Sequence, residues 1–170
     1  FTASVALAQA YPNKPIRMIV PFPPGGGTDF VARTVGQALA GQLGQQVVVE
    51  NRAGASGMIG VESAARSAPD GYTLLIAGVG ELTINPSLYR KVPYDTLKDL
   101  VPVTNIAINP MVLVVNPAVL PVNTQAELIA NAKSNPGKLN FASFGPGSIA
   151  HVIGEQFARR AGIRIVHVPY

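Results

Sequence analysis

Short runs of aliphatic and β-branched residues alternate along the chain with stretches in which apolar residues recur every three or four positions. The first run, 16–21 (IRMIVP), is bounded by prolines and predicts a buried strand. In the stretch that follows, the apolar residues recur at i+4: Val31, Val35, Leu39 and Leu43. This spacing predicts a helix that Thr28 or Asp29 caps and that Gly44 ends.

The same alternation continues through the first half of the chain. We expect a strand at 46–50 (QVVVE), a short helix at 59–67 and a third strand at 73–77, with a Pro69-Asp70-Gly71 turn before it. Strands that alternate with helices at this spacing are typical of βαβ units, with a mainly parallel sheet and right-handed crossovers. The fold class is therefore α/β.

The middle of the chain is less regular, and the alternation then resumes. X-Pro dipeptides at 85–86, 92–93 and 109–110 punctuate the middle. The remaining expected elements are a short helix at 96–100, a buried strand at 111–115 (MVLVV), a helix from Thr124 to about 135, a strand at 139–144, a helix from Ser148 to Ala161 ended by Gly162, and a strand at 163–168.

Composition narrows the class of protein. The 170 residues are 48% hydrophobic and 13% charged, which is typical of a globular chain. The net charge is +4, but the basic residues are scattered instead of gathered in a patch, so we expect no nucleic-acid partner. With no Cys and only two His, we expect no metal site. No apolar run is long enough to span a bilayer, and we expect a soluble product.

The segment 1–10 (FTASVALAQA) is small and apolar and finishes in Ala8-Gln9-Ala10. Small-x-small is the pattern that a signal peptidase accepts, so we interpret 1–10 as the remnant of a signal peptide. An ordinary N-terminal strand or linker is the alternative.

The loop at 21–29 (PFPPGGGTD) joins the first expected strand to the first expected helix. Its glycines let backbone N–H groups approach a ligand, and the helix N-terminus adds unpaired donors and partial positive charge. The loop is a candidate anion site, with a plain βα connection as the alternative. A phosphate-binding loop would need Gly-Lys-Ser/Thr where this chain has Gly27-Thr28-Asp29. Asp29 suits a helix cap, or a partner for an ammonium or hydroxyl group of a ligand.

A second glycine loop, 143–151 (SFGPGSIAH), lies between a later strand and helix. Gly145, Gly147 and Ala150 match the loose dinucleotide pattern G-x-G-x-x-A. Pro146, however, lacks an amide that a pyrophosphate would use, and no acidic residue about 20 positions on could hold a ribose. A carboxylate held by the Gly147 and Ser148 amides and by the Ser148 hydroxyl needs nothing that the sequence lacks.

Two further features of the sequence bear on function. Ser148 and His151 can touch at i, i+3, but there is no G-x-S-x-G elbow and no evident orienting acid, which argues against a serine hydrolase. Gly78 and the residues up to Glu81 follow the third expected strand. They are expected to line a ligand crevice beyond the carboxyl ends of the strands, or to form a plain surface loop.

A set of motifs in this order is similar to the Bug-type receptors, the extracytoplasmic solute-binding proteins of tripartite tricarboxylate transporters. The motifs run from Tyr11 to Tyr170: YPNKPIRMIVPFPPGGGTD, VVVENRAGASGMIG, PDGYTLL, NPSLY, VPYD, PGKLNFAS, GPGS-IAH and VHVPY.

The resemblance implies a two-lobed periplasmic-binding-protein (Venus flytrap) fold, here truncated at the C-terminus. The first lobe would span 11–105, and 106–170 would begin the second. It also implies that the two glycine loops grip a ligand carboxylate, partly through bound waters. The residues carried over are Phe22, Gly26, Gly27, Thr28 and Asp29 in the first loop, and Ser143, Gly145, Gly147, Ser148 and His151 in the second.

The resemblance also implies a protein that binds its ligand and catalyses no reaction. We expect a periplasmic, monomeric binding protein with no cofactor, whose partners are a small organic acid and the membrane subunits of the transporter. An enzyme on a doubly wound sheet that uses a nucleotide or another cofactor is the alternative. Many relatives have a polar or His-containing stretch where this chain has 81–84 (ELTI). That segment can face the distal end of the ligand, so the identity of the acid stays open.

Overall fold

The computed structural model describes residues 11–170, so the expected signal-peptide remnant lies outside the described residues. The described chain forms two compact units. Unit 1 comprises 11–78 and 93–100, and unit 2 comprises 79–92 and 101–170. Residues 79–92 thus pack with unit 2, whereas the expected lobe boundary at 105/106 placed them in the first lobe. That boundary stays a prediction for the lobes.

Unit 1 is built on a three-stranded parallel sheet, as the sequence predicted. The strands are β1 (Ile16–Val20), β2 (Val47–Asn51) and β3 (Thr73–Leu75), in the order β2-β1-β3. Met18 of β1 pairs with Val49 on one side and with Leu74 on the other. The centre strand is almost fully buried, because its apolar run is covered on both faces. The carboxyl end of β1 therefore has a fixed position, and the first glycine loop starts there.

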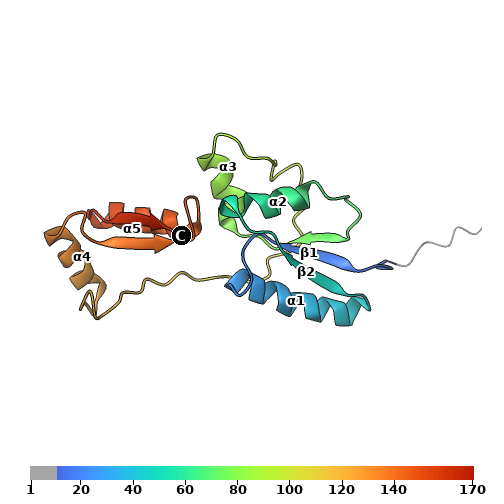
Figure 1. The fold of residues 1–170 in the computed structure, drawn as a ribbon, viewed down its shortest axis with the longest axis horizontal. Coiled ribbons are helices and arrows are strands. Elements are labelled where there is room, and N and C mark those ends of the chain that lie inside the picture. The colour runs from blue at the N-terminus through green and yellow to red at the C-terminus, as the bar shows by residue number, and fades with distance from the viewer. Residues whose placement is uncertain (1–10) are drawn as a thin grey trace, which may run out of the picture. The chain divides into compact units, whose positions relative to one another are not determined.

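The helices of unit 1 are α1 (Gly27–Leu43) and α2 (Met58–Ala65), with a 3₁₀ turn, η1 (Ala55–Gly57), before α2 (Figure 1). Helix α1 packs on the sheet through Ala32, Val35 and Leu39. It ends at Gly44 in the left-handed conformation, as expected. The expected cap, Thr28 or Asp29, is wrong by two or three residues. The extended residue before α1 is Gly26, and the side chain of Asp29 reaches back to the N–H of Gly25.

Unit 2 carries a two-stranded parallel sheet of β4 (Asn140–Ser143) and β5 (Val166–Pro169), with helices α4 (Gln125–Ser134) and α5 (Ile149–Ala161). Both helices begin at the expected N-cap residues. Thr124 Oγ1 accepts from the N–H of Glu127 at 3.2 Å, and Ser148 Oγ accepts from the N–H of His151 at 3.3 Å. A buried cluster joins α4 and α5 to the chain before β5, and its members are Ala132, Ala158 and Ile163.

Unit 2 also contains a helical segment that the sequence did not predict. It consists of a π-helical turn, η2 (Gly80–Ile84), followed directly by α3 (Asn85–Leu88). The Asn85-Pro86 pair suggested a break, but Pro86 lies in the first turn of α3.

Two expected elements are wrong. Residues 96–100 form one turn instead of a helix, closed by the Asp99 N–H donating to the Asp95 carbonyl at 2.8 Å. Residues 111–115 form no strand, and Val112 and Val114 are 77% and 80% exposed. A strand needs a neighbour for its backbone hydrogen bonds, and no described strand lies beside this run.

Candidate functional site

The first candidate site is the loop between β1 and α1. It follows the carboxyl end of the centre strand, where parallel sheets bind ligands. Gly25, Gly26 and Gly27 are exposed. Gly25 has a φ of +88°, a conformation that residues with a Cβ rarely adopt. The first N–H groups of α1, those of Gly27 and Thr28, have no acceptor within the helix. The loop therefore presents backbone donors at the positive end of a 17-residue helix.

Asp29 orders this loop from the inside. Its side chain is buried, and its two oxygens accept from Gly25 N–H at 2.9 Å, Arg33 Nε at 3.0 Å and Asn51 Nδ2 at 2.9 Å. The Arg33 guanidinium, the Gly25 N–H and the Asn51 amide hold the pKa of the Asp29 carboxyl well below its usual range. These contacts tie Asp29 to the loop backbone and to β2, and none of them is a side-chain cap of α1. The expected alternative, a partner for a ligand group, stays a hypothesis.

Asn51 is a residue of this site that the sequence reasoning missed. Its Nδ2 donates to the carbonyl of Phe22 at 3.0 Å as well as to Asp29, and its Oδ1 accepts from the Arg33 guanidinium at 3.2 Å. Asn51 thereby fixes the backbone at Phe22. A signal was present, because Asn51 ends the strand beside β1 and the carboxyl ends of parallel strands meet at one edge.

The second candidate site is the loop between β4 and α5. Gly145 and Gly147 have φ values of +108° and +85°, so both positions favour glycine. Several loop amides are engaged within the loop. Gly145 N–H donates to Ser143 Oγ at 3.1 Å, Gly147 N–H to His151 Nδ1 at 3.3 Å, and Ser148 N–H to the Gly145 carbonyl at 3.2 Å.

These contacts change which donors of the second loop remain for a ligand. The sequence nominated the amides of Gly147 and Ser148, and both are engaged within the loop. The donors left at the start of α5 are the first-turn N–H groups of Ile149 and Ala150, which have no acceptor within the helix. The Ser148 hydroxyl also keeps its proton, because its oxygen serves as an acceptor in the cap.

The second loop rests on the unpredicted η2–α3 segment. Tyr89 Oη donates to the Pro146 carbonyl at 2.9 Å. A Cβ at Gly147 would lie 2.7 Å from Asn85 Oδ1 and 3.0 Å from Leu88 Cδ2. The motif NPSLY, which entered only as part of the resemblance, therefore supplies the surface on which the loop lies.

Both histidines of the chain lie beside this loop. His167 Nε2 is 2.6 Å from Ser143 Oγ. The imidazoles of His151 and His167 are stacked with centroids 4.1 Å apart, and Phe141 stacks with His167 at 4.9 Å. His167 was missed. The signal was its place in VHVPY, since parallel pairing of β4 and β5 brings it opposite Phe141.

Gly78 and Glu81, the third sequence candidate, fall in different units. Gly78 is exposed at the end of the first segment of unit 1, and its expected role in binding stays a prediction. Glu81 belongs to η2 in unit 2, and its side chain is buried.

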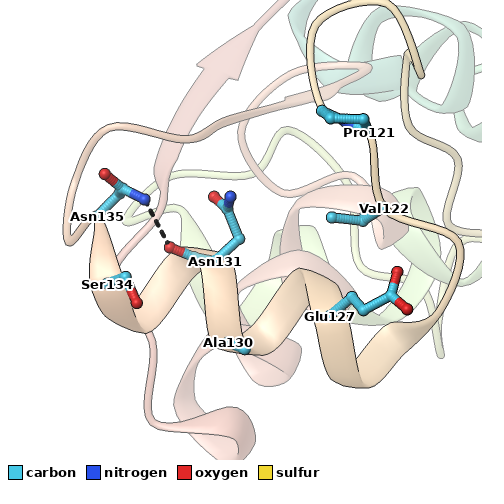
Figure 2. A pocket seen from close by; sticks show the side chains of 7 residues that line it. All are labelled: Pro121, Val122, Glu127, Ala130, Asn131, Ser134 and Asn135. Carbon is cyan, nitrogen blue, oxygen red and sulfur yellow. Dashed lines mark hydrogen bonds between the residues drawn. The ribbon is translucent and has the colours of Figure 1, made fainter.

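A hollow in unit 2 offers no comparable site. Figure 2 shows it between the outer side of α4 and the chain at Pro121 and Val122. Its carboxylate, Glu127, accepts from the N–H of Asn123 at 2.7 Å, and the Nδ2 of Asn135 donates to the Asn131 carbonyl. The charge of Glu127 disfavours an anion here, and these polar groups already serve the ends of α4.

Within residues 11–170 no group of three or more His, Cys, Asp or Glu side chains is placed to hold a metal ion. None of the helices over the same residues combines the length and the apolar character needed to cross a membrane.

The sequence model of the tripartite tricarboxylate transporter family receptor matches residues 31–170. The chain belongs to this receptor family. Among curated relatives of the receptor, protein BugT of Bordetella pertussis is 47% identical over 173 residues, which cover 99% of the chain and 53% of BugT. The receptor chain spans about half the length of the curated relatives it matches.

Solved structures agree with the family assignment. The receptor resembles "R. palustris Rpa4515 with adipate", at a TM-score of 0.91 and 37% identity over 95% of the chain and 54% of the other. It resembles the periplasmic binding protein BugD at 0.76 and 31%, over 94% and 53%. MatC from Rhodopseudomonas palustris with bound malate matches at 0.78 and 28%, over 94% and 54%. The Bug-type resemblance and the expected periplasmic-binding-protein fold are confirmed.

Proposed function

We propose that the receptor is a periplasmic solute-binding protein that captures a small organic acid and delivers it to the membrane subunits of a tripartite tricarboxylate-type transporter. It acts as a monomer, uses no cofactor and does no chemistry on its ligand. Export would use a signal peptide to which residues 1–10 belong, and that peptide would be removed. The matching family is one of transporter receptors, and BugD is named as a periplasmic binding protein, which supports this proposal.

The proposal rests on a strand–glycine loop–helix arrangement that occurs in each unit. A glycine loop follows a parallel strand and leads into a helix of 17 residues in unit 1 and 13 in unit 2. In each case the first helical N–H groups lack an acceptor within the helix, and an anion is the ligand that such groups favour. We propose that both loops donate to the same bound acid, with the lobes closing on it.

The ligand class follows from this chemistry and from the relatives. Backbone N–H groups recognise a carboxylate without specifying the rest of the molecule. Solved relatives hold adipate in one case and malate in another, so dicarboxylates are the first compounds to test.

The feature that would favour the enzyme alternative is the Ser143–His167 pair. Its two side chains are as close as a nucleophile and its base. Ser143 is 6% exposed, and its oxygen already accepts from the Gly145 N–H. A hydrolase would also hold the imidazole with a carboxylate, and the described hydrogen bonds of His167 include none to an acid. The pair therefore fits a structural role better than a catalytic one.

Ser148→Ala tests the function directly. The change removes a hydroxyl that can donate to the ligand, and losing a charge-assisted hydrogen bond of about 1.5–3 kcal/mol weakens binding by about 10- to 150-fold. The measurement is a thermal-shift screen of the full-length receptor with adipate, malate and other organic acids, followed by calorimetry. Nucleotides should give no shift.

Thr124→Ala is the matched control, because Thr124 caps α4 in the way that Ser148 caps α5 but lies outside the glycine loop. It should cost a similar amount of stability, about 0.5–2 kcal/mol, and leave affinity unchanged. Equal affinities for the two variants, or a shift with nucleotides only, would contradict the proposal.

A further inference from the structure

His167 takes part in no expected site, yet it contacts both sides of the second glycine loop. Its Nε2 lies 2.6 Å from Ser143 Oγ, at the carboxyl end of β4. Its ring stacks on His151, one turn into α5. Ser143 and His151 are in turn the acceptors for loop amides, those of Gly145 and Gly147 respectively. One imidazole thus connects the two acceptors that hold the loop backbone.

We propose that His167 is a positioning residue of the carboxylate site: it holds Ser143 and His151, and through them the backbone of residues 145–148. The inference rests on the proposed function, since it assigns how that site is kept in shape. His167 itself touches no ligand in this account.

The stack has a fixed place because α5 lies directly on β4. A Cβ at Gly154 would overlap the ring of Phe141, so α5 can approach this closely only with glycine there. Phe141 stacks with His167, and His167 stacks with His151. The three rings form one continuous stack, which fixes the His167 ring while its Nε2 faces Ser143.

The hydrogen bonds define the protonation state that this arrangement needs. Nδ1 of His151 accepts from the Gly147 N–H, so neutral His151 carries its proton on Nε2. A proton added at Nδ1 would place two donors face to face and release the Gly147 amide. It would also put a charge 4.1 Å, centroid to centroid, from the imidazole of His167. The hydrogen bond from the Gly147 N–H therefore needs an unprotonated Nδ1 on His151.

The groups that face His167 favour its neutral form. Partial burial and repulsion from His151 lower the pKa of the His167 imidazole, and the exposed carboxylate of Glu155 on α5 opposes the shift. On β4 the contacting residues, Phe141 and Ser143, add no charge. Because the pKa of His167 is lower in the folded state than in the unfolded state, protonating His167 destabilises the folded state. This cost sets in as the pH falls below about 6.5. We expect binding to weaken with acidification in the same range.

The test compares two substitutions in the full-length receptor, with adipate and malate as probes. His167→Phe keeps a stacking ring but loses Nε2, and His167→Gln keeps a polar group near the position of Nε2 but loses the ring. At pH 8 we expect His167→Phe to weaken binding by about 2- to 12-fold, as for one lost hydrogen bond, and His167→Gln to restore most of it. Both should show less loss of affinity between pH 7 and pH 5 than the natural protein. Val166→Ala, an exposed neighbour on β5, should behave as the natural protein at both pH values.

A second measurement needs no ligand. In receptor labelled with [¹⁵N]glycine, His167→Phe should move the amide resonances of Gly145 and Gly147, and Val166→Ala should not. Natural affinity together with unmoved resonances in His167→Phe would overturn the proposal. If His167→Phe does not fold, a natural pH profile in His167→Gln would overturn it. If no acid binds the natural receptor, the proposed function fails, and the glycine resonances still decide whether His167 positions the loop.

Discussion

Gly147→Ala is expected to lower the free energy of unfolding of the receptor by about 2 to 5 kcal/mol, and to abolish the binding of organic acids. Two costs add. The residue has a φ of +85°, and a left-handed conformation costs a residue with a Cβ about 1–2 kcal/mol. The new Cβ would also lie 2.7 Å from Asn85 Oδ1, and inserting a methyl group into such a contact costs about 1–3 kcal/mol.

Gly137→Ala separates the two costs. Gly137 has a similar φ of +76° in the same unit, but a Cβ there would meet nothing within 4 Å. This control should lose only about 1–2 kcal/mol and should bind acids normally. The measurement is urea unfolding of both full-length variants, with calorimetry at 25 °C. Equal losses of stability in Gly147→Ala and Gly137→Ala would show that α3 does not press on the loop. Normal binding of acids by Gly147→Ala would show that the loop is not part of the binding site.

Asp29→Asn is expected to weaken the binding of organic acids by about 100-fold, although Asp29 need not touch the ligand. The carboxylate is 4% exposed and accepts from Gly25, Arg33 and Asn51. An amide has one acceptor oxygen and presents an NH₂ group where an oxygen had accepted, so donors in the loop lose their partner. The loop backbone before α1 should then lose its shape. The measurement is calorimetry on the full-length variant.

The acid dependence of stability offers a second readout for the same change. The pKa of Asp29 is lowered in the folded state by Arg33, Gly25 and Asn51. Its contribution to stability is therefore complete above an unfolded-state pKa of about 4 and is lost as the pH falls from there toward the lowered pKa. Asp29→Asn should flatten this part of the stability profile.

Asp70→Asn is the control for Asp29→Asn. The pKa of Asp70 is also lowered, by the Tyr72 N–H and by Lys14, but its side chain is 40% exposed and lies away from the loop. Water can replace the lost contacts of an exposed group, so affinity should not change. A similar loss of affinity in the two variants would mean that Asp29 has no specific part in the loop.

The elements that the sequence predicted well are those with local signals. The β1 run, the i+4 spacing of α1 and the caps Thr124 and Ser148 each depend on neighbours in sequence, and the structure places them as expected. The 111–115 run failed because an apolar segment of five residues predicts a strand only if a partner strand is available. The η2–α3 segment was missed because Asn85-Pro86 usually ends an element, whereas here it begins α3.

The two glycine loops could be found from the sequence, but not what holds them. Glycine spacing before a helix identifies a possible anion site whatever lies around it. The supports Asn51, Tyr89 and His167 lie 22 or more positions away from the residues they contact, at Asp29, Pro146 and Ser143. The pairing of strands and the packing of α3 bring them together, so the sequence signals Asn51 and His167 only indirectly, through the strands on which they lie.

A double-mutant cycle tests our proposal that both loops hold the same acid. The cycle uses Gly27→Val, which blocks close approach to the first loop, and Ser148→Ala in the second. The affinity of the full-length receptor for adipate, or for the acid that the screen identifies, is measured by calorimetry for the natural protein, both single variants and the double variant. If the loops share the ligand, the losses in binding free energy should depart from additivity by at least about 0.5 kcal/mol. Losses that add within about 0.3 kcal/mol, or an unchanged affinity in Ser148→Ala, would contradict the account.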